Sequence, residues 1–264
     1  MCLEPYEGEG VAVSRHDAVL AYTGSDIAAL IKAGNLLVST RESSRENLEI
    51  ISKHPEVEER LMMWTKAVFL CISASNGLVA LGTSQPLPGP PRSRLALIAR
   101  GQWSGAARRD CAAYQVRHFK GGPCEPALPM VVAFVPDDEL AALVEHCKSS
   151  SSGGGLAGLD RLRRVAPGYL VGDFETLRPI ALARHATRGV CTTLRVVWGY
   201  AGWGKTQILA EIARGGWGLV ALTDFVAGRP DASLDVEWEL DCGWSRIVNV
   251  ARCAPRSEYW RRGG

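Results

Sequence analysis

Residues 199–206 are the segment of this chain whose residue types and spacing most clearly suggest a binding site. They read GYAGWGKT and fit the pattern G-x-x-x-x-G-K-[ST], in which backbone N–H groups and a lysine surround phosphate oxygens. In this interpretation Gly199 and Gly204 shape the loop, Lys205 meets the β and γ phosphates, and Thr206 holds a magnesium ion. The β-branched run before the loop and the helical pattern after it match the strand and helix that such a loop joins.

Two features favour a simpler interpretation of the same residues. Tyr200 and Trp203 are large, whereas a phosphate cradle needs small residues so that backbone amides can approach the ligand. The chain after Thr206 is also short for the strand–helix units of a phosphate-loop fold, with Asp224 as the one acidic candidate for the magnesium partner. We therefore expect a strand-to-helix turn whose glycines take positive φ angles and whose aromatic residues cover an apolar cluster, and we expect no cofactor. A nucleotide-binding protein remains the alternative.

Composition excludes several classes of protein. The 264 residues carry 30 Lys and Arg against 28 Asp and Glu, so a net charge of +2 gives no strong global attraction for nucleic acid. The eight cysteines are scattered without a C-x-x-C pair or histidines at zinc spacing, which favours reduced thiols and no metal site. The longest central apolar run, residues 67–72, is far below the roughly 20 residues of a membrane span. The acidic first ten residues lead us to expect no targeting segment.

Periodicity and turn residues predict a mixture of helices and strands. In the first half we expect a helix from Ser25 to Gly34, a strand at 36–38, charged helical residues at 43–65 broken by Pro55, and a hairpin turning at Asn76-Gly77. The remaining predicted elements are strands at 114–119, 130–135, 194–198, 217–223 and 234–240, helices at 136–147 and 174–186, a helix that Gly215 ends, and a flexible loop at 149–155. Hairpins mixed with single helices predict an α+β or α/β fold.

The segment GYAGW at 199–203, followed by QILAEI at 207–212 and by Trp217, resembles the signature of the YqgE/AlgH family. Weaker similarities follow the same order at residues 36–40, 68–87, 121–123 and 167–175. The resemblance implies an α+β domain in which a bifurcated mixed sheet curls into a pseudo-barrel with flanking helices. It implies neither an enzyme nor catalytic residues. The family-motif positions that we take as candidate binding residues are Gly121, Gly122, Asp173, Gly199, Tyr200, Gly202, Trp203, Gln207 and Glu211.

On this basis we divide the chain into three parts. Residues 1–33 form an N-terminal helical extension, residues 34–230 the YqgE/AlgH-like domain with insertions near 41–66 and 149–155, and residues 231–264 a C-terminal strand and tail. Within the domain we expect Asp173 to cap a helix rather than to act in acid–base chemistry. Cys124, after the turn at 121–123, is expected to be a semi-buried thiol.

The expected function is that of a non-enzymatic regulatory, accessory or scaffold subunit that contacts a protein partner or a larger assembly. We find no helix-turn-helix with a basic face, so we expect no direct DNA recognition. The short apolar runs lead us to expect no membrane insertion. An RNA-associated factor is a second alternative, because Tyr259 and Trp260 precede Arg261 and Arg262 in the tail. The expected compartment is the matrix or stroma of an organelle, with the cytoplasm as the alternative.

Overall fold

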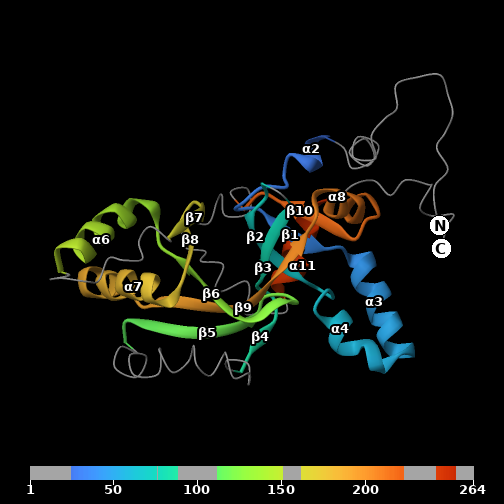
Figure 1. Ribbon diagram of the computed structural model, residues 1–264, viewed down its shortest axis with the longest axis horizontal. Coiled ribbons are helices and arrows are strands. Elements are labelled where there is room, and N and C mark those ends of the chain that lie inside the picture. Colours follow the sequence, from blue (N-terminus) through green and yellow to red (C-terminus); the bar gives the residue numbers. More distant parts are fainter. Residues whose placement is uncertain (1–24, 76, 89–111, 151–161, 223–241, 254–264) are drawn as a thin grey trace.

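A computed structural model describes residues 25–75, 77–88, 112–150, 162–222 and 242–253, and the account below concerns these ranges (Figure 1). Their main feature is one large mixed sheet, in the strand order β11-β10-β1-β2-β3-β9-β6-β8-β7, with β4 and β5 branching from this path. The strands are β1 Leu36–Ser39, β2 Val68–Ser73, β3 Leu78–Gly82, β4 Pro86–Leu87, β5 Tyr114–Lys120, β6 Cys124–Phe134, β7 Arg163–Ala166, β8 Tyr169–Gly172, β9 Thr192–Trp203, β10 Trp217–Val220 and β11 Arg252–Cys253.

The sheet forks along β9. The first part of β9 pairs in parallel with β5, from Thr192 beside Tyr114 to Trp198 beside Lys120. The last part pairs instead with β3, antiparallel, from Ala201 to Trp203. Along its other edge β9 pairs with β6. The predicted α+β fold with a bifurcated, curled sheet and flanking helices is confirmed.

Glycines make the fork sterically feasible. The Gly82 N–H donates to the Gly121 carbonyl oxygen at 2.7 Å, and the Gly121 N–H donates to the Trp198 carbonyl oxygen at 2.8 Å. A Cβ atom on Gly121 would lie 2.1 Å from the Gly199 carbonyl oxygen. Gly199 itself has a φ of +77°, which a residue with a side chain adopts only with strain. The two predicted motifs at 121–123 and 199–203 therefore meet at the fork, backbone against backbone.

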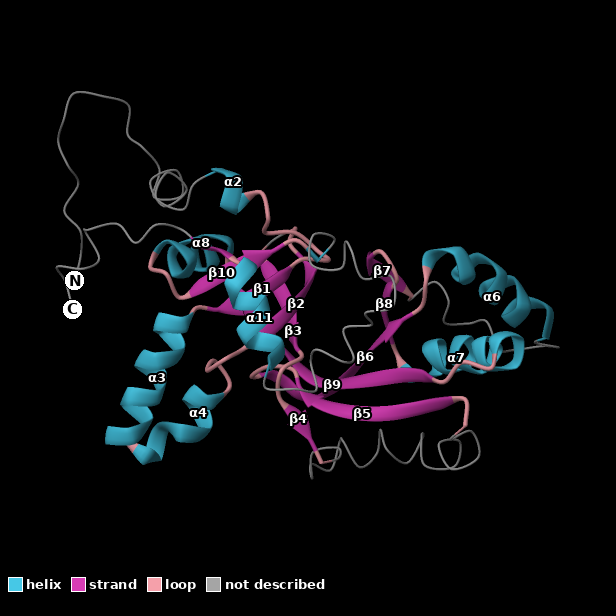
Figure 2. Cartoon of the chain, turned by 180° about the vertical axis from the view of Figure 1, so that it is seen from behind, coloured by secondary structure: helices cyan, strands magenta, loops and turns pink. Residues whose placement is uncertain are grey.

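Helices cover both ends of the sheet (Figures 1 and 2). They are α2 Ser25–Ala28, α3 Arg41–Lys53, the short 3-10 helix η1 Pro55–Val57, α4 Glu58–Met62, α6 Asp137–Ser150, α7 Phe174–Arg188, α8 Lys205–Ala213 and α11 Cys242–Val250. The predicted interruption at Pro55 is confirmed, since α3 ends at Lys53. In Figure 2 the arm made of α3, η1 and α4, residues 41–62, projects from the sheet. We call it the α3–α4 arm.

Three apolar clusters hold these layers together. One lies between α7 and the first part of β9, and includes Leu177, Ile180 and Val196. A second joins β1, β2 and β8. The third contains Phe69, Trp203 and Trp217 together with Ile208 and Ile212 of α8. Each cluster contains residues from strands that are far apart in the sequence. The helices therefore pack on a sheet that long-range strand pairing has assembled.

Several predicted elements differ from the structure. Residues 199–203 are not a turn but the end of β9, because their backbone pairs with β3 and β6. The helix after Ser25 ends at Ala28, before the predicted Gly34. The loop expected at 149–155 is partly wrong, since Ser149 and Ser150 belong to α6.

The structure also contains elements that the sequence did not predict. The hairpin β7–β8 was missed, and α11 lies where a tail was expected. The predicted hairpin is confirmed as the antiparallel pair β2–β3, although Asn76 lies outside the described residues. The helices after Pro136 and from Phe174, and the helix ending before Gly215, are also confirmed. The predicted strand at 234–240, the rest of the 149–155 loop and the aromatic–basic tail at 259–262 lie outside the described residues.

Candidate functional site

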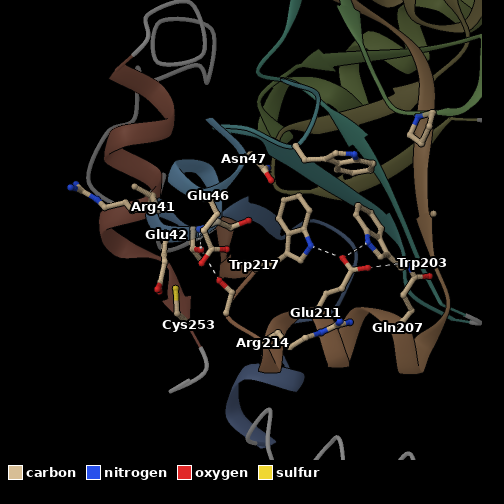
Figure 3. A pocket seen from close by; sticks show the side chains of 18 residues that line it. Arg41, Glu42, Glu46, Asn47, Trp203, Gln207, Glu211, Arg214, Trp217 and Cys253 are labelled. Carbon is tan, nitrogen blue, oxygen red and sulfur yellow. Dashed lines mark hydrogen bonds between the residues drawn. The ribbon is translucent and has the colours of Figure 1, made fainter. Parts of the chain in front are cut away.

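An open groove of about 1430 Å³ lies between α3, α8 and α11 (Figure 3). We call it the α3–α8 groove. The elements that form it come from distant parts of the sequence. Its lining comprises Thr40, Arg41, Glu42, Ser43, Glu46, Asn47, Trp64, Pro123, Gly202, Trp203, Gln207, Glu211, Arg214, Gly215, Gly216, Trp217, Val248 and Cys253.

Aromatic rings form the floor of the groove. Trp64 follows α4, Trp203 ends β9 and Trp217 begins β10, and the three indoles pack with centroids 5.8 to 6.1 Å apart. Phe69 packs beneath them, with its ring centroid 5.7 Å from each of the three. Most of these pairs meet edge to face, which is the arrangement that aromatic quadrupoles favour. The predicted apolar cluster beneath Trp203 is present.

The Glu211 carboxylate joins two of these indoles (Figure 3). Its Oε2 atom accepts hydrogen bonds from Trp203 Nε1 at 3.0 Å and from Trp217 Nε1 at 2.8 Å. Its Oε1 atom accepts from Gln207 Nε2 at 2.9 Å. Gln207 in turn accepts from the Gly204 N–H at 3.4 Å and so caps the start of α8. The motif residues Trp203, Gln207 and Glu211 are therefore brought together in one hydrogen-bonded group.

The wall opposite α8 depends on Thr40, the N-cap of α3. The Thr40 hydroxyl donates to the Gly215 carbonyl oxygen at 2.6 Å, and the Thr40 N–H donates to that of Gly216 at 3.1 Å. The same hydroxyl oxygen accepts from the Ser43 N–H at 3.2 Å. These contacts fix the base of α3 beside the turn between α8 and β10. Sequence analysis missed this contact, because nothing in the local pattern indicates that residues so far apart meet.

Helix α11 closes the remaining side of the groove. Trp244 Nε1 donates to the Ser39 carbonyl oxygen at 2.9 Å, and Arg41 Nη2 donates to Asn249 Oδ1 at 2.5 Å. The end of β11 then places Cys253 in the lining. Arg41 of α3 therefore both lines the groove and contacts α11.

Charges in the groove are mixed, with a small excess of acids. The carboxylates are Glu42, Glu46 and Glu211, and the guanidinium groups are Arg41 and Arg214. Figure 3 shows Glu46 and Asn47 on one side of the Trp217 indole and Glu211 on another. Arg41 bonds to Asn249, and Arg214 Nε donates to the Ala210 carbonyl oxygen of its own helix at 3.2 Å.

The other predicted positions have separate places in the fold. Gly121, Gly122 and Gly199 lie at the fork of the sheet, where a Cβ on Gly122 would come within 2.1 Å of the Tyr200 carbonyl carbon. Asp173 lies at the start of α7, where its Oδ1 accepts from the Thr176 N–H at 2.8 Å, so its predicted role as a helix cap is confirmed. Of the nine family-motif positions, four therefore line the groove: Gly202, Trp203, Gln207 and Glu211.

Tyr200 lies beside Cys124 and Glu125. Its hydroxyl donates to Glu125 Oε1 at 3.4 Å, and the negative charge of Glu125 raises the pKa of the Tyr200 phenol, with burial and Cys124 adding to the effect. Glu125 has a φ of +44°, within a bulge of β6. Cys124 is half-buried, as expected.

The four residues of the alternative phosphate-binding pattern do not form a loop together. Gly199 lies at the fork, whereas Gly204, Lys205 and Thr206 lie at the start of α8. The residues between them are extended, with Tyr200 paired with β6 and residues 201–203 paired with β3. Their backbone is therefore committed to the sheet, whereas a phosphate cradle needs a turn that directs successive N–H groups at the anion. Nucleotide binding stays an untested alternative.

The described ranges contain neither a metal-binding cluster nor a membrane-spanning helix. No group of three or more His, Cys, Asp and Glu side chains there has the geometry to hold a metal ion. No helix in those ranges has the length and apolar character that a membrane crossing requires.

Comparison with known proteins gives one family match. The model of the AlgH-like family matches residues 54–234. A crystal structure of a protein from Corynebacterium diphtheriae is similar at 16% identity over 82% of this chain and 91% of that one, with a TM-score of 0.42. The solution structure of the AlgH protein from Pseudomonas aeruginosa is similar at 14% identity over 78% and 92% of the two chains, with a TM-score of 0.38. No curated protein sequence gives a significant match.

Proposed function

This chain is a member of the AlgH-like family, and we propose that it acts as a non-enzymatic accessory or scaffold subunit through contacts with a protein partner. The observation that carries the proposal is that three large apolar side chains of the α3–α4 arm are exposed. Leu48, Ile50 and Met62 are 43%, 44% and 41% exposed on this projecting element. These exposed side chains are available for contact with a partner, and exposed apolar surface is typical of interaction sites.

The position of the arm supports this proposal. Helix α3 lies before the residues that the family model matches, which begin at 54. Its base is nevertheless fixed to the domain by Thr40 and by Arg41. A firmly based helix that presents apolar side chains to solvent suits docking, because a partner gains apolar contact without ordering the helix first.

The hydrogen bonds of the family motif support a binding role rather than catalysis. The Glu211 carboxylate accepts from two indoles and from Gln207, so its oxygens serve to fix the groove floor. Cys71, Cys124, Cys147, Cys191 and Cys253 are not joined in disulfide bonds, which fits a reducing compartment. We propose the matrix or stroma of an organelle as that compartment, with the cytoplasm as the alternative.

Co-migration in a native cell extract tests the proposal. We expect the tagged chain to migrate in a complex larger than its own 28.5 kDa. The double substitution Leu48→Asp with Met62→Asp should shift it towards the monomer, because charges on the arm oppose apolar docking. Leu128→Asp is the matched control, because Leu128 is also exposed, at 46%, but lies on β6.

Two results would contradict the proposal. One is a wild-type chain that migrates as a monomer in the extract. The other is a complex that survives the arm substitutions as well as it survives Leu128→Asp. In the second case the protein would still have a partner, but the α3–α4 arm would not be its contact.

A further inference from the structure

We infer that an extended segment of a partner protein pairs with the end of β9 in the α3–α8 groove, through the main-chain N–H and C=O groups of Gly202. The inference rests on the proposed function, because it names how a partner is held at one surface of the same protein. It concerns a strand edge in the groove and not the exposed side chains of the α3–α4 arm, so the two can be tested separately.

The main chain of Gly202 faces away from β3. Its two neighbours, Ala201 and Trp203, pair with β3. The Trp203 carbonyl oxygen lies on the β3 side, because a Cβ atom on Gly77 would be 2.4 Å from it. Successive residues of a strand direct their N–H and C=O groups to opposite edges of that strand. The N–H and C=O of Gly202 therefore point to the other edge of β9.

Among the described residues, no strand lies along that other edge at Gly202. Strand β6 pairs with β9 as far as Tyr200, which lies opposite Cys124. Pro123 has no N–H to donate, and no main-chain hydrogen bond joins the segment 121–123 to Gly202. Gly202 is exposed and lines the groove together with Pro123. The end of β9 therefore offers one donor and one acceptor on the same open edge.

A donor and an acceptor on one strand edge match the main chain of an extended peptide. In a hydrogen-bonded antiparallel pair, each residue exchanges both main-chain bonds with the residue opposite. Gly202 can therefore donate to the carbonyl oxygen and accept from the N–H of one residue of the partner. This is recognition by strand addition, in which main-chain bonds provide affinity and side-chain contacts provide specificity.

Helix α3 supplies neutral hydrogen-bonding groups to the same groove. Ser43 and Asn47 are four residues apart, so they lie on one face of the helix, and both line the groove. Both residues are half-buried, and no hydrogen bond in the described ranges involves the Ser43 hydroxyl or the Asn47 side-chain amide. A side-chain amide can donate to a main-chain carbonyl and accept from a main-chain N–H. The groove therefore holds groups suited to a peptide main chain on α3 as well as on β9.

Peptide selection followed by main-chain substitution tests the inference. The probe is a random heptapeptide library displayed on phage and selected against the full chain, and the enriched peptide is then synthesised with a fluorescein label. We expect saturable binding by fluorescence anisotropy. N-methylation of the peptide residue opposite Gly202, found by scanning each position, should lower the affinity by at least about fivefold, because that residue can no longer donate to the Gly202 carbonyl oxygen.

Two substitutions of Gly202 separate its main chain from a side chain at the same position. Gly202→Pro removes the N–H on the open edge and leaves the pairing of Ala201 and Trp203 with β3, so it should lower the affinity by at least about fivefold. Gly202→Ala keeps the N–H and is the matched control, because its Cβ would lie at an ordinary 3.7 Å from the Tyr200 ring. We expect Gly202→Ala to bind like the wild type. Circular dichroism establishes that both variants are folded.

A second substitution, on α3, leaves the sheet unchanged and serves if Gly202→Pro does not fold. Asn47→Ala removes the amide from the groove and should lower the affinity by at least about threefold. Ser52→Ala is its control, because Ser52 is exposed on the same helix and does not line the groove.

Three results would overturn the inference. They are a selection that yields no saturable binder, a binder that N-methylation weakens at no position, and a binder that the folded Gly202→Pro variant, or Asn47→Ala in its place, binds as tightly as its control does. If any of these occurs while the complex in the cell extract still depends on Leu48 and Met62, only the strand pairing is wrong. If the wild-type chain is also a monomer in the extract, the proposed function is wrong as well.

Discussion

At the scale of single residues, Glu211 links the family motif to the groove. The sequence placed Gln207 and Glu211 four residues apart on a helix, and therefore on one face. It could not predict that Trp217, beyond the turn at Gly215, returns its indole N–H to the same carboxylate oxygen as Trp203. That contact depends on β10 pairing with β1, a strand from the start of the domain.

Removal of the Glu211 carboxylate should destabilise the protein. Glu211→Ala leaves two indole N–H groups without their acceptor, and hydrogen bonds to charged groups contribute about 1.5–3 kcal/mol each. We expect the free energy of unfolding to fall by about 2–4 kcal/mol. Glu211→Gln keeps one acceptor oxygen and should lose less. Urea unfolding measures the stability of both variants. Glu59→Ala is the control, because Glu59 is exposed. An unchanged stability in Glu211→Ala would show that the indoles do not depend on this carboxylate.

The burial of Cys71 leads to a second prediction at this scale, which concerns how stability depends on pH. Burial raises the pKa of its thiol from 9.0 to about 12. Above pH 9 the unfolded state therefore releases this proton while the native state keeps it, so stability falls as pH rises towards 12. The expected slope from this group is about 1.4 kcal/mol per pH unit.

Unfolding measured between pH 8 and pH 11 checks the effect of Cys71, because this range lies below its raised pKa of about 12. Cys71→Ala should have a shallower decline than the wild type. In the native protein the exposed Cys191 should react with iodoacetamide long before Cys71 does. Rapid native alkylation of Cys71 would contradict its burial.

At the scale of elements, the fork in the sheet explains which glycines the fold requires. Gly121 and Gly199 touch backbone to backbone, whereas a Cβ on Gly202 would meet the Tyr200 ring at an ordinary 3.7 Å. Gly121, Gly199 and Gly202 all lie in short glycine-rich motifs of the sequence. The sequence does not indicate which of these glycines lies against another strand. The difference arises only when β9 is placed between β3, β5 and β6.

Alanine substitutions should separate the two kinds of glycine. Gly121→Ala places a Cβ 2.1 Å from the Gly199 carbonyl oxygen, so the fork cannot close without moving a strand. We expect a loss of more than about 3 kcal/mol, or no folded protein. Gly202→Ala should stay within about 1 kcal/mol of the wild type. Thermal unfolding provides the measurement, and equal midpoints for the two variants would contradict the described packing.

The elements that the sequence predicted well have local signals. The hairpin at Asn76-Gly77, the break at Pro55 and the cap at Asp173 each follow from residues within a few positions. Residues 199–203 were predicted wrongly because glycine favours turns locally, whereas pairing with β3 and β6 keeps them extended. Helix α11 was missed because its position depends on distant partners such as Ser39.

At the scale of the whole molecule, the nucleotide alternative makes a distinct prediction. A ligand present at 100 times its dissociation constant stabilises a protein by about 2.7 kcal/mol. Because residues 200–203 are extended, we expect magnesium ATP or GTP to leave the unfolding midpoint unchanged in the wild type and in Lys205→Ala. A thermal shift that the wild type shows and Lys205→Ala lacks would favour the phosphate-loop interpretation instead.

Site-directed photocrosslinking in cells tests the central claim, action through protein contacts, most directly. A photoreactive amino acid at Leu48 would sample the α3–α4 arm, and the same amino acid at Leu128 would sample an equally exposed position on β6. Our account predicts a discrete protein adduct from position 48 that position 128 does not give. The absence of any adduct at position 48, or the same adducts from both positions, would contradict it.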